Sequence, residues 1–222
     1  MRDLRQNLAL IRYRLREAGR EVRLVAVTKN VPASLVGEAL ALGVQSFGEN
    51  RLQEAMPKMA MFPQADWHFI GRLQTNKVRD AVGRFSLIHS LDRWDLAMAL
   101  QQQAQKKGVT VKALVQVNVA GEQQKGGLPP EELTDFLTAV AGLSCLQVAG
   151  LMTVPPYEDD PERVRPFFRE MSRLFRTCRV PGVRMQILSM GMSNDYLVAV
   201  EEGATLVRLG SAIFGSRTAE GG

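Results

Sequence analysis

The sequence is poor in cysteine and histidine, with only two residues of each among 222. Cys145 and Cys178 lie far apart, and neither belongs to a Cys-x-x-Cys pair. A zinc site needs about four such ligands at close spacing, and a disulfide scaffold needs far more cysteine. We therefore expect no metal site and no disulfide framework, and we interpret the two cysteines as packing residues.

Long apolar runs are also missing. No stretch reaches the roughly 18 to 20 apolar residues that cross a membrane, and Met1 to Arg5 lack the apolar core of a secretory signal. The composition, 45% hydrophobic and 23% charged, fits a globular protein. Because no linker, repeat or low-complexity tract marks a boundary, we predict one soluble, cytoplasmic domain over residues 1–222, with no membrane partner.

The charge balance is mildly basic: 28 Lys and Arg against 23 Asp and Glu give a formal net charge of +5. That sign favours anionic partners, from nucleic acids to phosphorylated metabolites. Arg165, Arg169, Arg173 and Arg176 recur at helical spacing opposite an apolar set. No aromatic run accompanies them, so we interpret them as a solvated helix face and expect no nucleic-acid partner. A nucleic-acid-binding module is kept as the third hypothesis.

Short apolar runs alternate with longer amphipathic segments. Leu4, Leu8, Ile11 and Leu15 predict a leading helix that stops at Gly19. Eight strands are predicted at residues 24–28, 44–47, 67–70, 87–89, 113–118, 146–152, 185–188 and 205–209. The helices between them are predicted at residues 33–42, 50–61, 76–82, 92–107, 131–141, 164–178 and 196–202.

Strict alternation of strand and helix predicts a parallel sheet, because each crossover returns the chain to the same end. Eight such units form either a closed barrel or an open doubly wound sheet, and periodicity does not separate the two. Barrels of this type begin at roughly 200 residues, so the chain has the length of an economical one. In a barrel, chemistry belongs at the carboxyl ends of the strands.

Lys29 stands at such an end, directly after the first predicted strand. Burial and nearby cations there would favour its uncharged amine, which can form a Schiff base. A lysine at a strand end can equally extend its aliphatic stem into solvent. Position alone therefore does not decide its role.

Two later segments have the composition of phosphate cradles. Residues 190–195 place a glycine and Ser193 before a helix, where backbone N–H groups and a hydroxyl can hold an anion. Gly210 and Ser211 repeat this arrangement after the eighth strand, beside Arg208. Gly-Ser pairs usually form turns, so each segment alone is weak. A lysine on strand one facing phosphate donors on strands seven and eight is more specific.

Together with these residues, the chain from Val25 to Gly215 resembles the pyridoxal phosphate homeostasis proteins, single-domain relatives of the N-terminal barrel of alanine racemase. The resemblance is carried by residues 26–29, 47–54, 67–77, 116–118, 150–155, 188–195 and 207–215. It implies a TIM (β/α)8 barrel, which we predict over residues 24–215 with the extra N-terminal helix in residues 1–20.

The resemblance implies that the protein binds pyridoxal 5′-phosphate (PLP) through a Schiff base on Lys29. The other cofactor contacts that it implies are Asn50, Met192, Ser193, Arg208, Gly210 and Ser211. Among these, the two serines and Gly210 match phosphate contacts, and Arg208 matches an arginine beside the pyridine nitrogen. A looser match over residues 118–127 maps onto Lys125 a lysine that would assist transfer of the cofactor.

The implied arginine bears on catalysis. A cationic Arg208 would keep the pyridine nitrogen unprotonated, because two positive charges at hydrogen-bond distance repel, and an unprotonated ring is a poorer electron sink. This argues against aminotransfer. Racemisation needs a base on each face of the substrate carbon, and alanine racemase takes its second base from a C-terminal domain. Of Tyr13, Tyr157 and Tyr196, Tyr157 in the loop after strand six is the one placed to approach the mouth.

We therefore predict a PLP carrier or regulator of intracellular PLP homeostasis, with no catalytic residue and no robust turnover. A weak PLP-dependent amino-acid racemase is the alternative. The expected partners are PLP and apo PLP-dependent enzymes, and the chain is expected to be a monomer or a weak dimer. We interpret His68 and His89 as hydrogen-bonded strand residues, and Glu49 and Glu54 as helix-terminus and surface carboxylates.

Overall fold

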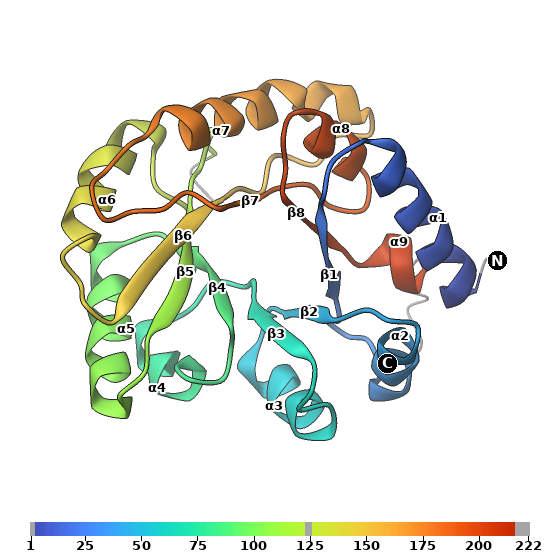
Figure 1. The fold of residues 1–222 in the computed structure, drawn as a ribbon, viewed down its shortest axis with the longest axis horizontal. Helices are drawn as coiled ribbons and strands as arrows, with labels where there is room; N and C mark the ends of the chain where they lie inside the picture. The colour runs from blue at the N-terminus through green and yellow to red at the C-terminus, as the bar shows by residue number, and fades with distance from the viewer. Residues whose placement is uncertain (1–2, 123–125, 216–222) are drawn as a thin grey trace.

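The computed structural model describes residues 3–122 and 126–215 as a closed barrel of parallel strands. The strands pair in chain order, and the last pairs with the first. Figure 1 shows the strands at the centre and the helices around them. The strands are β1 Arg23–Val27, β2 Ser46–Glu49, β3 Asp66–Phe69, β4 Leu87–Leu91, β5 Val111–Gln116, β6 Leu146–Met152, β7 Ile187–Ser189 and β8 Leu206–Leu209.

The helices alternate with these strands as predicted, and the pairing of β8 with β1 confirms the barrel and excludes the open sheet. The α-helices are α1 Leu4–Glu17, α2 Ala33–Ala41, α3 Leu52–Met61, α4 Val78–Ala81, α5 Trp94–Lys107, α6 Leu133–Val140, α7 Arg165–Thr177, α8 Tyr196–Glu201 and α9 Ser211–Phe214. Short 3-10 helices occupy η1 Thr75–Lys77, η2 Pro130–Glu132 and η3 Pro161–Val164. Over the described ranges, no helix is both long and apolar enough to span a bilayer.

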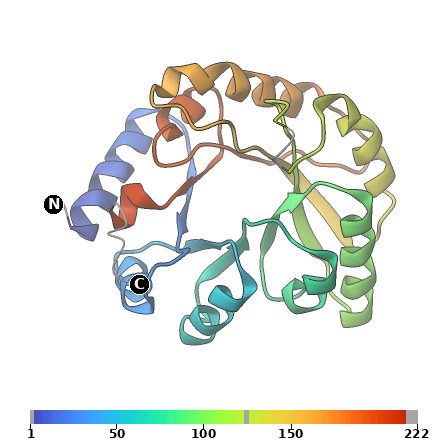
Figure 2. The ribbon, with the colours of Figure 1, turned by 180° about the vertical axis from the view of Figure 1, so that it is seen from behind.

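The leading helix α1 completes the outer layer where α8 and α9 are short. Its predicted apolar face is buried in the core. α1 lies beside α9 in both views (Figures 1 and 2), and the Asn7 side-chain amide donates a hydrogen bond of 2.9 Å to the carbonyl of Ile213. The carboxylate of Asp3 caps the helix by accepting the N–H of Gln6 at 2.8 Å. The N-terminal segment is thus part of the packed barrel.

The basic face of α7 is compensated by glutamates. Arg165 pairs with Glu162 at 2.6 Å and with Glu202 of the neighbouring segment at 2.9 Å. Arg173 pairs with Glu170, one turn away, at 2.6 Å. These pairs are typical of a solvated helix face, as the sequence pattern indicates.

The last three strands of the barrel differ in how they pair: β6 and β7 approach each other closely, and β7 and β8 are paired over few residues. Gly150 of β6 has φ +152°, and a Cβ atom there would lie 1.9 Å from the carbonyl oxygen of Ile187 in β7. Only glycine fits such an approach. β7 and β8 meet at one register pair, Ser189 with Leu206, fewer than at any other strand boundary. Backbone hydrogen bonds continue the contact on either side of that pair, because the N–H groups of Thr205, Met190 and Arg208 donate to the carbonyls of Leu188, Leu206 and Gly191.

Candidate functional site

Lys29 lies at the carboxyl end of β1, half-buried. Its amine makes no hydrogen bond and no ion pair with any residue that the structure describes. The β1–β8 register pairs Val25 with Arg208, so Lys29 follows the strand that lies next to the strand of Arg208. The sequence-predicted lysine thus has an unpaired amine and follows a strand adjacent to the one that carries the predicted arginine.

Arg208 is almost fully buried and held at both ends of its guanidinium. One nitrogen donates to the hydroxyl of Ser189, and the other donates to the carbonyl of Thr153 at 2.8 Å. Burial lowers the pKa of Arg208 to about 10, while the carboxylate of Asp195 acts in the opposite direction. The side chain is therefore a fixed cation at neutral pH.

The turns after β7 and β8 contact each other through Ser193. Its hydroxyl accepts the backbone N–H groups of Gly210 at 3.2 Å and Ala212 at 3.1 Å. The N–H groups of Ser193 and Ser211 donate to no group among the described residues. Two free N–H donors and a hydroxyl therefore lie together, as an anion-binding cradle requires.

The turn that presents Ser193 is fixed by backbone constraints. Gly191 has φ +94°, and a Cβ there would lie 2.6 Å from the Cβ of Ala199. The N–H of Met192 donates to the carboxylate of Asp195 at 2.6 Å. Burial raises the pKa of Asp195, and the hydrogen bond from Met192 opposes that rise. Met192 itself is half-buried in this turn.

Beneath Lys29 lies a buried ion pair that the sequence interpretation missed. Glu49 is fully buried at the end of β2, so its interpretation as a helix-terminus or surface carboxylate is wrong. Its Oε1 accepts hydrogen bonds of 2.6 Å from both the Thr28 hydroxyl and the Lys58 ammonium, and Lys58 also donates to the Thr28 carbonyl at 2.7 Å. The other oxygen of Glu49 has no partner in the described part of the chain. The signal available was that Lys58 shares a helix face with the buried Ala55.

Glu54 is a different case, since it is half-buried at the start of α3. It accepts the backbone N–H of Asn30 at 3.0 Å and lies 3.6 Å from Arg51. Asn30 has a positive φ of 56°, a conformation that asparagine tolerates. This carboxylate fixes the turn that follows Lys29.

The two histidines form a hydrogen-bonded chain across the barrel interior, which confirms their interpretation as hydrogen-bonded strand residues. Asp66 contacts His68 at 2.9 Å, His68 contacts His89 at 3.1 Å, and His89 contacts the hydroxyl of Ser189 at 3.1 Å. Ser189 in turn receives the hydrogen bond from Arg208. Burial lowers the pKa of His89 well below its usual value, and the positive charges of His68 and Arg208 add to that effect.

The remaining predicted residues are placed as follows. Asn50 follows β2, and its side-chain oxygen is buried with no hydrogen-bond partner among the described residues. Its backbone carbonyl lies so close to Gly71 that a Cβ there would approach to 2.2 Å. Tyr157 is 75% exposed in the loop after β6. Lys125 lies outside the described residues.

The chain is thus a closed (β/α)8 barrel with an unpaired lysine after its first strand and a candidate anion site after its last two. The model of the alanine racemase N-terminal domain matches residues 1–218. Two proteins named pyridoxal phosphate homeostasis protein are similar over most of their length. The one from Aquifex aeolicus (strain VF5) is 46% identical over 88% of this chain and 87% of its own. The one from Escherichia coli (strain K12) is 37% identical over 98% of each. The chain belongs to the pyridoxal phosphate homeostasis protein family.

Solved structures agree with this assignment. PipY of Synechococcus elongatus without PLP has a TM-score of 0.89 and 38% identity, and the match covers 96% of this chain and all of that one. PipY with PLP bound has a TM-score of 0.85 and 37% identity over the same shares.

Proposed function

We propose that this chain binds PLP covalently at Lys29 and acts as a carrier in intracellular PLP homeostasis. The observation that carries the proposal is the unpaired amine of Lys29 beside the β8 strand that holds the buried cation of Arg208. PLP supplies an aldehyde that condenses reversibly with such an amine and releases water. PipY, which shares the fold and 37% of its sequence, has been solved with PLP bound.

The cradle after β7 and β8 fits the phosphate of PLP. The free N–H groups of Ser193 and Ser211 would donate to phosphate oxygens, and Gly210 joins the two turns through its hydrogen bond to the Ser193 hydroxyl. The side-chain oxygen of Asn50, which has no partner among the described residues, would make a polar contact with the pyridine ring. The half-buried Met192 would make an apolar contact with it. Buried polar groups without partners are rare in folded proteins, so Asn50 points to a ligand.

The residues favour holding over turnover. Arg208 stays cationic and is fixed by Ser189 and Thr153, so it would keep the pyridine nitrogen unprotonated. Tyr157, the candidate second base, is largely exposed. We therefore infer a cytoplasmic carrier that passes PLP to apo PLP-dependent enzymes, as a monomer or weak dimer and without nucleic-acid partners.

The covalent attachment is tested by replacing Lys29 with alanine. Protein loaded with PLP is expected to show the absorbance of a covalent lysine adduct, which borohydride fixes for mass spectrometry. Lys29→Ala should lose both signals, whereas Lys112→Ala, at an exposed β5 position, should retain both. A fixed adduct that persists in Lys29→Ala would refute the assignment.

A further inference from the structure

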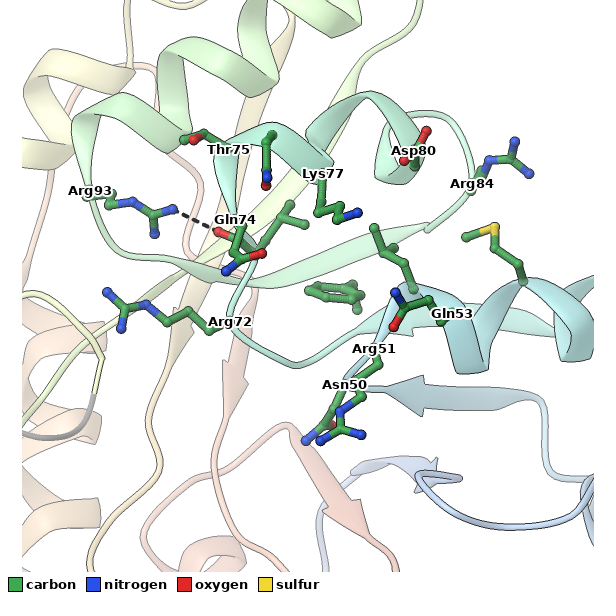
Figure 3. Close-up of a pocket in the computed structure, with 15 residues that line it drawn as sticks. Asn50, Arg51, Gln53, Arg72, Gln74, Thr75, Lys77, Asp80, Arg84 and Arg93 are labelled. Atoms are coloured by element: carbon green, nitrogen blue, oxygen red, sulfur yellow. Dashed lines mark hydrogen bonds between the residues drawn. The ribbon is translucent and has the colours of Figure 1, made fainter.

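A cavity of about 970 Å³ opens beside the barrel mouth, between α3 and the segment from η1 to α4. Its size is that of a small-molecule site. Among the residues proposed above to contact PLP, Asn50 lines it and the other six do not. The lining includes five basic side chains and one carboxylate, that of Asp80 (Figure 3).

Some of these charges already have partners. The pairs are Arg51 with Glu54 at 3.6 Å, Arg93 with Asp92 at 2.6 Å, and Asp80 with Arg79 at 3.6 Å. The carboxylate of Asp80, the acidic group of the lining, is therefore paired with Arg79, which does not itself line the cavity.

The side chains of Arg72, Lys77 and Arg84 make no ion pair or hydrogen bond within the described part of the chain. All three are exposed side chains that line the same concave surface. In Figure 3, Lys77 and Arg84 lie toward one end and Arg72 toward the other, with Gln74 between them. Three unpaired cations on one concave surface favour an anionic ligand.

The apolar part of the lining, its floor, adds a second feature. Leu52 and Met56 are half-buried apolar residues of the lining, and the amides of Gln53 and Gln74 supply polar groups around them. Lysine and arginine bind phosphate oxygens through charge-assisted hydrogen bonds, and the planar guanidinium of Arg72 can stack on a ring. The cavity thus combines cations for a phosphate with a surface for a planar body.

Two segments of the chain, residues 47–54 and 67–77, supply most of the lining. The proposed PLP contacts use only Asn50 from these segments. Glu49 and Glu54, which accept hydrogen bonds from the residues on either side of Lys29, do not line the cavity.

We propose that this cavity is a second binding site, separate from Lys29, for a phosphorylated organic anion with a planar ring. Lys77 and Arg84 bind the phosphate, and Arg72 with the apolar floor contacts the ring. Pyridine 5′-phosphates and nucleotides share this chemistry, and the experiment distinguishes them.

The test measures binding by calorimetry to protein whose Lys29 adduct has been fixed with borohydride, so that the first site is filled. The probes are pyridoxine 5′-phosphate, which has no aldehyde, adenosine monophosphate, and inorganic phosphate. One organic phosphate is expected to bind at least about tenfold more tightly than inorganic phosphate. Should Lys29 take up no PLP, the Lys29→Ala protein serves for the same titration, so failure of the first proposal does not decide this one.

The variants locate the site. Lys77→Gln combined with Arg84→Gln should weaken the bound organic phosphate by about tenfold or more, because two charge-assisted contacts are lost. Lys112→Gln, at an exposed β5 position outside the lining, should leave affinity unchanged. Equal affinity in the double variant, no binding of either organic phosphate, or inorganic phosphate binding as tightly would overturn the proposal. The melting temperature of each variant confirms that it is folded.

Discussion

At the scale of single residues, the Glu49–Lys58 pair explains how a free lysine is held in place. Burying two charges costs several kcal/mol per ion, which close hydrogen bonds must offset. The pair has a specific structural effect, because Lys58 connects α3 to the carbonyl of Thr28, the residue before Lys29. The backbone next to Lys29 is therefore held in place, although the Lys29 amine itself has no partner among the described residues.

His89 should make stability depend on pH. Its folded-state pKa is depressed, so the unfolded chain takes up the proton first as pH falls below about 6.5. The contribution of His89 is therefore fully present above that pH and is lost below it. Urea unfolding is expected to show a loss of roughly 1.4 kcal/mol between pH 7.5 and 5.5 from this residue.

The variant His89→Gln provides the comparison, because glutamine can hydrogen bond but does not titrate in this range. Its unfolding free energy should fall less than that of the parent protein over the same two pH units. Parallel curves for parent and variant would contradict a neutral, buried His89.

At the scale of elements, long apolar and periodic segments were predictable and short ones were not. β6 has the predicted bounds, residues 146–152, because a seven-residue buried strand carries a clear signal. The helix predicted at 76–82 is instead η1 followed by the one-turn α4, and α9 was not predicted as a helix. Elements of about one turn have no periodicity to detect.

The same limit applies to the candidate site. Residues at strand ends, such as Lys29 and Arg208, could be proposed because the fold places ligands there. The burial of Glu49 could not, since it depends on Lys58 arriving from a different element. Likewise, the cavity beside α3 arises from residues that no single segment brings together.

Gly150→Ala should destabilise the barrel where β6 meets β7. A Cβ placed 1.9 Å from the Ile187 carbonyl forces the two strands apart, at a cost expected to exceed about 2 kcal/mol. For a chain of this size that corresponds to a melting temperature lower by roughly 4 to 8 °C. Gly142→Ala is the control, because its Cβ would meet nothing closer than 3.9 Å. Similar melting temperatures for both variants would show that the strands can separate without cost.

At the scale of the whole molecule, a measurement of turnover distinguishes the proposed PLP carrier from the alternative, a weak racemase. Protein loaded with PLP is expected to exchange D- and L-alanine no faster than the same concentration of free PLP, and Tyr157→Phe should change nothing. Chiral chromatography of the amino acid measures both. Exchange above the free-PLP rate that falls in Tyr157→Phe would establish weak racemisation instead.

The boundary between β7 and β8 is also where the barrel would feel its ligand. Ser193 and Gly210 follow these two strands, one on each side, and are joined by a hydrogen bond of 3.2 Å. A ligand held by both turns would add contacts across the same boundary, so its binding energy would also stabilise the closed ring. A melting temperature that rises with PLP occupancy is the expected sign of this linkage.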